Sequence, residues 1–134
     1  MRSLSYAEVN EGDELPVLDI PITTTAIVAG AIASRDYQDV HHDAELARER
    51  GSKDVFMNIL TTNGYVGRYV TDWAGPDAIL QKVAIRLGAP NYPDDTMLMT
   101  GQVTKKADGV VEVSLKGTNS LGDHVVGTVT LVLP

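Results

Sequence analysis

Four consecutive segments in the second half of the chain alternate apolar and polar residues, which is the pattern of half-buried β-strands. They cover residues 78–88, 96–105, 110–117 and 123–133. Residues 110–117 alternate strictly, and the preceding Ala107-Asp108-Gly109 is typical of a tight hairpin turn. This half of the chain therefore predicts a run of antiparallel strands.

The first half combines one strand candidate with three helix candidates. The strand is expected over residues 15–23, where two prolines favour an edge position in a sheet. Small apolar residues predict a helix over 25–34, and a charged helix over 44–50 is expected to end at Gly51.

The longest helical pattern extends from the region of Ser52 to Gly75. Ser52 is the expected N-cap, and apolar residues recur at helical spacing from Phe56 onward. Gly64 and Gly67 lower the helix propensity of this segment, so we expect another element to pack closely against them.

One long helix followed by antiparallel strands predicts an α+β fold in which the sheet wraps around the helix. The 134 residues fit one domain, and the chain contains no repeat and no low-complexity linker. We therefore expect a single domain over residues 1–134.

Composition narrows the classes of function. The absence of cysteine excludes disulfides, thiolate catalysis and cysteine-based metal sites. The net charge of −7 argues against sequence-independent binding to nucleic-acid phosphates, because such binding needs clustered Lys and Arg. No apolar run approaches the roughly 20 residues of a membrane span, and the N-terminus lacks the apolar stretch of a signal peptide. We expect a cytoplasmic protein with neither a nucleic-acid nor a membrane partner.

The densest cluster of ionisable residues is the polar loop between the first two helices. Asp36 and His41 are five residues apart, far enough for a loop to bring both side chains to one point. A carboxylate and an imidazole around one water form a workable acid–base pair, because imidazole titrates near neutral pH and the carboxylate orients it.

Two other interpretations of this loop stay open at this point. It can be a solvated connection in which Asp43 caps the following helix. It can also be a metal site, since five of its side chains are potential ligands: Asp36, Asp39, His41, His42 and Asp43. Their spacing matches no recognised ligand pattern, so the metal interpretation is less favoured than catalysis.

The segment 36–41 resembles the hydratase motif of MaoC-like and R-specific enoyl-CoA hydratases, Asp-x-Asn-Pro-x-His. The catalytic pair of that family falls on Asp36 and His41, whereas Gln38 and Asp39 replace the Asn and the Pro. His42 lies outside the motif and is expected to be structural. Further segments resemble the small subunits of actinobacterial steroid side-chain enoyl-CoA hydratases: residues 33–43, 51–54, 69–76 and 119–124.

The resemblance implies a hot-dog fold, a curved antiparallel sheet around one long helix. It also implies hydration of a bulky, steroid-type 2-enoyl-CoA thioester, with Asp36 and His41 positioning and deprotonating the water and delivering a proton to C2. The backbone N–H of Asn58, where the family usually has a glycine, is the expected donor to the enolate oxygen. No metal and no cofactor are expected, because coenzyme A is part of the substrate.

The resemblance further implies a related MaoC-like partner subunit, in a heterodimer or heterotetramer whose sheets join side by side. A partner would also suit the acidic charge of this chain, because coenzyme A needs local positive charge. Two alternatives remain: a hot-dog acyl-CoA thioesterase and a non-catalytic pairing subunit. The spacing of Asp36 and His41 favours hydration over the first, and the presence of both residues argues against the second.

Overall fold

The computed structural model describes residues 1–134 and consists of one five-stranded sheet and three α-helices. The strands are β1 (Glu14–Ile22), β2 (Ile79–Leu87), β3 (Asp95–Ala107), β4 (Val110–Asn119) and β5 (Gly122–Val132). The helices are α1 (Thr24–Ala33), α2 (Ala44–Glu49) and α3 (Ile59–Ala74), with 3-10 turns η1 (Tyr6–Glu8) and η2 (Asp39–His41). None of the helices has the length and apolar character needed to cross a membrane.

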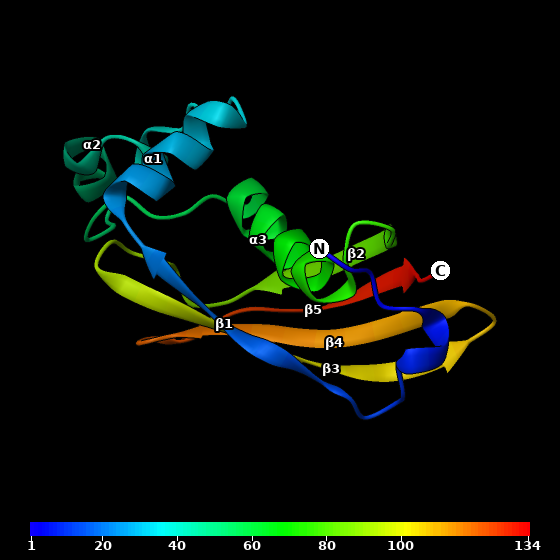
Figure 1. Cartoon of the computed structure of the whole chain (residues 1–134). Coiled ribbons are helices and arrows are strands. Elements are labelled where there is room, and N and C mark those ends of the chain that lie inside the picture. The colour runs from blue at the N-terminus through cyan, green and yellow to red at the C-terminus, as the bar shows by residue number, and fades with distance from the viewer.

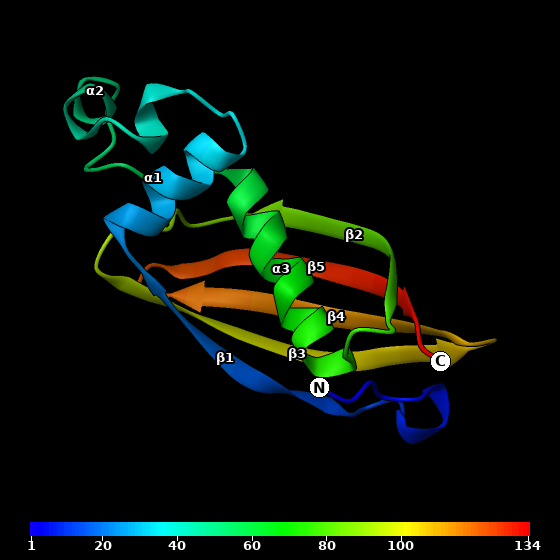
Figure 2. The same ribbon diagram turned by 45° about the horizontal axis from the view of Figure 1, so that its top comes forward.

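The sheet has the strand order β1-β3-β4-β5-β2, and every neighbouring pair is antiparallel. It curves around α3, which lies across one of its faces, while α1 and α2 lie beyond one end of the sheet (Figures 1 and 2). The predicted α+β architecture, an antiparallel sheet around one long helix, is therefore confirmed.

The core fills the space between α3 and the sheet. Val66 and Val70 of α3 are fully buried against inward-facing residues of the central strands, such as Val113 and Val129. This is the burial expected when strands alternate and a helix presents one apolar face. The same alternation predicted the strand boundaries, which all lie within two residues of the observed ones.

Local sequence signals explain several element ends. The β3–β4 turn places Asp108 and Gly109 at φ values of 54° and 81°, the left-handed pair that a two-residue hairpin requires. Asp43 caps α2 through the backbone N–H of Leu46, and Gly51 follows that helix at φ 96°. β1 is an edge strand, as its prolines predicted.

The predicted start of the long helix at Ser52 is wrong, because α3 begins at Ile59 with Asn58 as its N-cap. The residues in between belong to no helix or strand, with bends at Lys53 and Asp54. Their backbone bonds reach other segments: the N–H of Phe56 donates to the carbonyl of Val40, and the N–H of Met57 to the carbonyl of Asn91. Apolar side chains in this stretch continue the helical spacing, although tertiary hydrogen bonds set the backbone conformation.

The expectation for the helix glycines is also corrected. A Cβ added at Gly64 would have no neighbour within 4 Å, and one at Gly67 would only touch a leucine side chain at 3.8 Å. The close approach occurs instead at Gly30 of α1, where a Cβ would lie 2.2 Å from the hydroxyl oxygen of Thr61. The glycine that lets two helices meet is therefore in the shorter helix.

Candidate active site

A helix C-terminal motif determines the position of Asp36. Arg35 adopts a left-handed φ of 55° after α1, the N–H of Arg35 donates to the carbonyl of Ile32, and that of Asp36 donates to the carbonyl of Ala31. These two bonds and the left-handed residue form a Schellman motif. The motif turns the chain so that the Asp36 carboxylate lies beside the start of α3.

The η2 turn brings His41 back to the same point. The Nε2 atom of His41 lies 3.6 Å from Oδ2 of Asp36, so the structure brings the two sequence-predicted residues together. The His41 side chain is 8% exposed and that of Asp36 is 23% exposed. A distance of 3.6 Å is too long for a direct hydrogen bond, but it is short enough for a single water oxygen to bond both atoms.

The backbone carbonyl of Phe56 orients the His41 ring. It lies 2.6 Å from Nδ1, and the Phe56 ring packs edge-on against the imidazole with 4.9 Å between ring centroids. A carbonyl oxygen only accepts, so Nδ1 carries the hydrogen and Nε2 of the neutral ring is a free acceptor. His41 therefore presents a proton acceptor toward Asp36.

The side chain of Asn58 joins the site to the start of α3. Its amide nitrogen donates to Oδ2 of Asp36 and to Oγ of Ser34, both at 3.0 Å, and its oxygen accepts from the backbone N–H of Thr61. This amide is the main reason that the pKa of Asp36 lies below its ordinary value, with a smaller contribution from the Gln38 N–H.

The backbone N–H of Asn58 donates to no acceptor within the chain. It lies at the N-terminus of a sixteen-residue helix, where unpaired N–H groups and the helix dipole favour negative charge. This is the arrangement that a backbone oxyanion donor requires. Asn58 lies at the start of the long helix because that helix begins at Ile59, later than the predicted start at Ser52.

Where the family motif has a proline, this chain has Asp39, which forms an ion pair. Asp39 is the first residue of the η2 turn. One oxygen of its carboxylate lies 2.6 Å from Nε of Arg50, and the other accepts a hydrogen bond from a terminal nitrogen of Arg50 at 2.9 Å. The guanidinium of Arg50 lowers the pKa of Asp39. His42, next to His41, instead bonds the carbonyl of Tyr37 at 3.0 Å, which fits the structural role expected for it.

No group of three or more His, Cys, Asp or Glu side chains is gathered as a metal site would require. His124 lies inside β5, in the segment where a strand was predicted. It is buried, and its ring nitrogens bond Thr62 and the carbonyl of Ala89 at 2.8 and 2.7 Å. Burial lowers its pKa.

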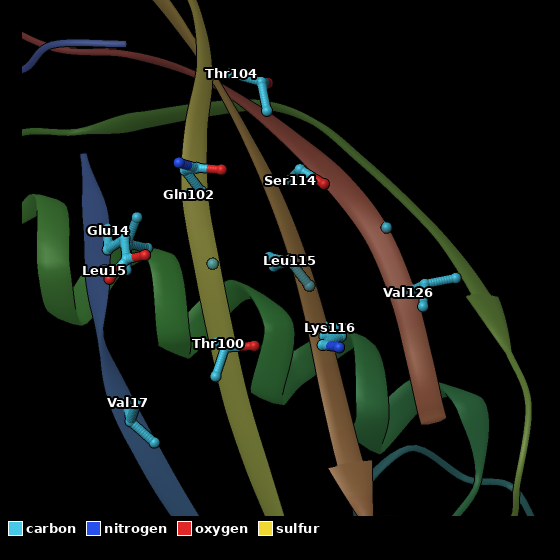
Figure 3. A pocket seen from close by; sticks show the side chains of 12 residues that line it. Glu14, Leu15, Val17, Thr100, Gln102, Thr104, Ser114, Leu115, Lys116 and Val126 are labelled. Atoms are coloured by element: carbon cyan, nitrogen blue, oxygen red, sulfur yellow. The ribbon is translucent and has the colours of Figure 1, made fainter. Parts of the chain in front are cut away.

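A groove of about 420 Å³ lies between α1 and α3. Small residues line much of it, with Gly30, Ala33 and Ser34 on one side and Thr61 and Gly64 on the other. A larger hollow of about 510 Å³ lies on the opposite face of the sheet from α3 (Figure 3). That hollow is lined by strand residues such as Gln102 and Lys116. Asp36, His41 and Asn58 line neither cavity, but Ser34 on the wall of the groove accepts a hydrogen bond from the Asn58 amide, which links the groove to the site.

Sequence reasoning proposed Asp36, His41 and the Asn58 backbone as site residues, but it did not name the Phe56 carbonyl or the Asn58 side chain, which bond His41 and Asp36. A backbone carbonyl leaves no sequence signal. Asn58 did leave one, since Asn directly before an amphipathic run is a preferred N-cap residue.

Comparisons with known proteins agree with this geometry. Residues 8–124 match the MaoC like domain family. The chain is 52% identical over 120 residues to the 3-oxo-4,17-pregnadiene-20-carboxyl-CoA hydratase beta subunit of Mycobacterium tuberculosis, covering 90% of this chain and 93% of the relative.

Two solved structures show the same fold. A chain in the ChsH1-ChsH2 complex from Mycobacterium tuberculosis superposes with a TM-score of 0.92 at 49% identity, over 94% of this chain and 99% of that chain. The R-hydratase PhaJ1 from Pseudomonas aeruginosa superposes with a TM-score of 0.90 at 21% identity, over 98% and 86%, and this likeness concerns the hot-dog fold alone. The chain is a member of the MaoC-like domain family.

Proposed function

We propose that this chain is the catalytic subunit of an enoyl-CoA hydratase that adds water across the 2,3 double bond of a bulky, steroid-type 2-enoyl-CoA thioester. The observation that carries the proposal is the pairing of Asp36 with a free Nε2 of His41 at 3.6 Å beside an unpaired backbone N–H. Family membership and the hydratase at 52% identity support the reaction class.

The pair has the polarity needed to activate water. Asp36 Oδ2 and His41 Nε2 are both acceptors, so a water held between them donates one hydrogen to each. As the water oxygen attacks C3, His41 takes one proton, and Asp36 stabilises the imidazolium that forms. His41 then returns the proton to C2, so water adds across the double bond and no co-reactant is needed.

Negative charge develops on the thioester oxygen during the attack. The backbone N–H of Asn58 at the start of α3 is the proposed donor to that oxygen. A single preorganised donor of this kind contributes about 10²–10³-fold to the rate in enzymes where it has been removed. Asn58 in place of glycine keeps this N–H, because every residue except proline supplies one.

A bulky acyl group suits the groove between α1 and α3. Gly30 and Ser34 on the α1 side and Gly64 of α3 line it, and Ser34 bonds the Asn58 amide that contacts Asp36. The relative's name specifies a steroid-type carboxyl-CoA, and we extend that substrate class to this chain.

The sheet edges favour a partner at β2. The other edge strand, β1, carries Pro16 and Pro21, which lack the N–H that pairing with another strand requires. β2 has neither proline nor glycine, and Ile79, Val83 and Leu87 are exposed along it. We propose that β2 joins the sheet of a related MaoC-like subunit to give a heterodimer or heterotetramer. The likeness of this chain to a chain of the ChsH1-ChsH2 complex supports a partner of this kind.

The test follows the enoyl-thioester absorbance of a steroid 2-enoyl-CoA with the chain alone and co-expressed with a MaoC-like partner. Asp36→Asn and His41→Ala are each expected to lower kcat by about 10²–10⁴-fold while the protein stays folded. His42→Ala is the matched control, because it removes a neighbouring imidazole that bonds Tyr37 outside the pair.

Equal rates for wild type and both variants would exclude a catalytic role for the pair and leave the pairing-subunit alternative. Release of free thiol in parallel with the absorbance change would indicate a thioesterase. Activity that appears only in the co-expressed sample would support the heteromer.

A further inference from the structure

We propose that the Asn58 side chain is the positioning residue for the Asp36 carboxylate, so that one residue orients the acid–base pair with its amide and serves the thioester oxygen with its backbone N–H. This inference rests on the proposed hydratase function. It concerns a different group of Asn58 from the backbone donor, and the following hydrogen bonds support it.

The Asn58 amide has every hydrogen-bonding position filled. Its two hydrogens go to Asp36 Oδ2 and Ser34 Oγ, and its oxygen accepts from both the N–H and the hydroxyl of Thr61. The residue is 1% exposed, so water cannot replace any of these partners. Rotating the amide by half a turn would place its oxygen against a carboxylate and its hydrogens against an N–H donor, so only one orientation is compatible with the site.

Ser34 fixes the second hydrogen of that amide. The Ser34 hydroxyl donates to the carbonyl of Gly30 at 2.7 Å and therefore has a lone pair free to accept from Asn58. Asn58 thus ties the last turn of α1 to the first turn of α3, and Asp36 lies between these two ends. The carboxylate cannot rotate away from His41 without giving up its bond to the amide.

This bond differs from ordinary helix capping in its electrostatic consequence. An N–H that donates to a carboxylate favours the ionised form, and the Asn58 amide is the largest cause of the lowered pKa of Asp36. The capping function belongs to the amide oxygen, whereas the positioning function belongs to the amide nitrogen. Substitutions can therefore separate the two.

Asn58→Asp is the discriminating variant. It keeps an oxygen that caps α3 through Thr61 and keeps the backbone N–H, but it replaces the amide donor by an acceptor facing Asp36. Asn58→Gly, the residue usual in the family, keeps only the backbone N–H. Both are assayed in the complex with the MaoC-like partner, using an enoyl-CoA that the wild type hydrates.

We expect kcat to fall by about ten- to a hundredfold in Asn58→Gly and further in Asn58→Asp, as loss of a hydrogen bond to a charged group predicts. KM should change much less. The acid limb of the kcat profile should move to higher pH in both variants, and the ¹³C carboxyl titration of Asp36 should move in the same direction. A merely structural role would lower the unfolding midpoint and leave both titrations unchanged, which would overturn the proposal.

Two further measurements keep the outcomes distinct. Ser34→Ala leaves Asn58 in place but removes one acceptor of its amide, so it should give a smaller shift of the acid limb in the same direction even if the Asn58 variants fold poorly. Asp36→Asn separates the two proposals. If Asp36→Asn retains full activity, the proposed function fails. If it is inactive while the Asn58 variants titrate as wild type, only the positioning role fails.

Discussion

The Nδ1 atom of His41 lies 2.6 Å from the backbone oxygen of Phe56, and this contact assigns the proton of the neutral ring. Long-range ¹H–¹⁵N correlation spectra should therefore show the Nδ1–H tautomer for His41 at a pH where the ring is neutral. His124 should show the same tautomer, because its Nδ1 faces the carbonyl of Ala89. An Nε2–H tautomer at His41 would contradict the proposed route, since Nε2 could then not accept a proton from water.

Asp39, the first residue of the η2 turn, should tolerate replacement by the proline that the family motif has at this position. The N–H of Asp39 donates to no acceptor in the chain, and Gln38 before it has φ −59° and ψ 129°, a conformation compatible with a following proline. Asp39→Pro is expected to fold, to keep its activity and to resist urea better than Asp39→Ala, because proline stiffens the unfolded chain.

Asp39→Pro and Asp39→Ala both lose the ion pair with Arg50, so the difference between them isolates the effect of the proline ring on stability. Urea titration of the two proteins measures this difference. If Asp39→Pro unfolds at lower urea than Asp39→Ala, the backbone of the turn differs from the one described.

The strands and the β3–β4 turn could be predicted because their signals are local. Alternation between a buried and an exposed face is visible in residues 110–117, and Asp108-Gly109 supplies the positive φ values of the turn. The start of α3 could not be predicted in the same way. Phe56 lies at helical spacing from Ile59 and Leu60, yet the backbone N–H groups of Phe56 and Met57 donate to carbonyls of distant segments, and no helix forms before Ile59.

The same difference between local signals and contacts from distant segments decides which parts of the candidate site could be predicted. The pair Asp36 and His41 could be predicted because it lies on one short loop and resembles a family motif. The groups that orient it come from residues 15 or more positions away, namely the Phe56 carbonyl and the Asn58 amide. Their contribution depends on how segments meet in space, which no pattern in the loop encodes.

Burial of His124 should make the fold sensitive to acid. Its pKa in the folded chain is lowered from 6.5, so the unfolded chain binds a proton first. The stabilisation by neutral His124 is therefore complete above about pH 6.5 and is lost as the pH falls through its lower folded pKa, with a slope of at most about 1.4 kcal/mol per pH unit.

Urea titrations between about pH 8 and pH 5 compare wild type with His124→Gln, and His42→Gln serves as the control. The His124 variant should be less stable at neutral pH and lose less stability on acidification. Parallel pH profiles for wild type and His124→Gln would show that another group causes the acid sensitivity.

Two glycines on opposite sides of the groove should respond to alanine in opposite ways. At Gly30 a methyl group would lie 2.2 Å from the Thr61 hydroxyl, which itself bonds Asn58. Gly30→Ala is therefore expected to destabilise the chain by about 1–3 kcal/mol through overpacking. At Gly64 a methyl group meets nothing within 4 Å, so Gly64→Ala should stabilise α3 by about 1 kcal/mol through helix propensity.

The packing of the chain does not require glycine at position 64, where a methyl group would meet nothing. Gly64 does line the groove between α1 and α3, where a side chain would take up space. If the acyl group occupies the space beside Gly64, Gly64→Ala should lower kcat/KM for a steroid 2-enoyl-CoA more than for a short 2-enoyl-CoA, even though the variant is more stable. Urea titration and paired kinetics with the two substrates measure both effects. Equal kcat/KM losses for the two substrates would place the bulky acyl group outside this groove.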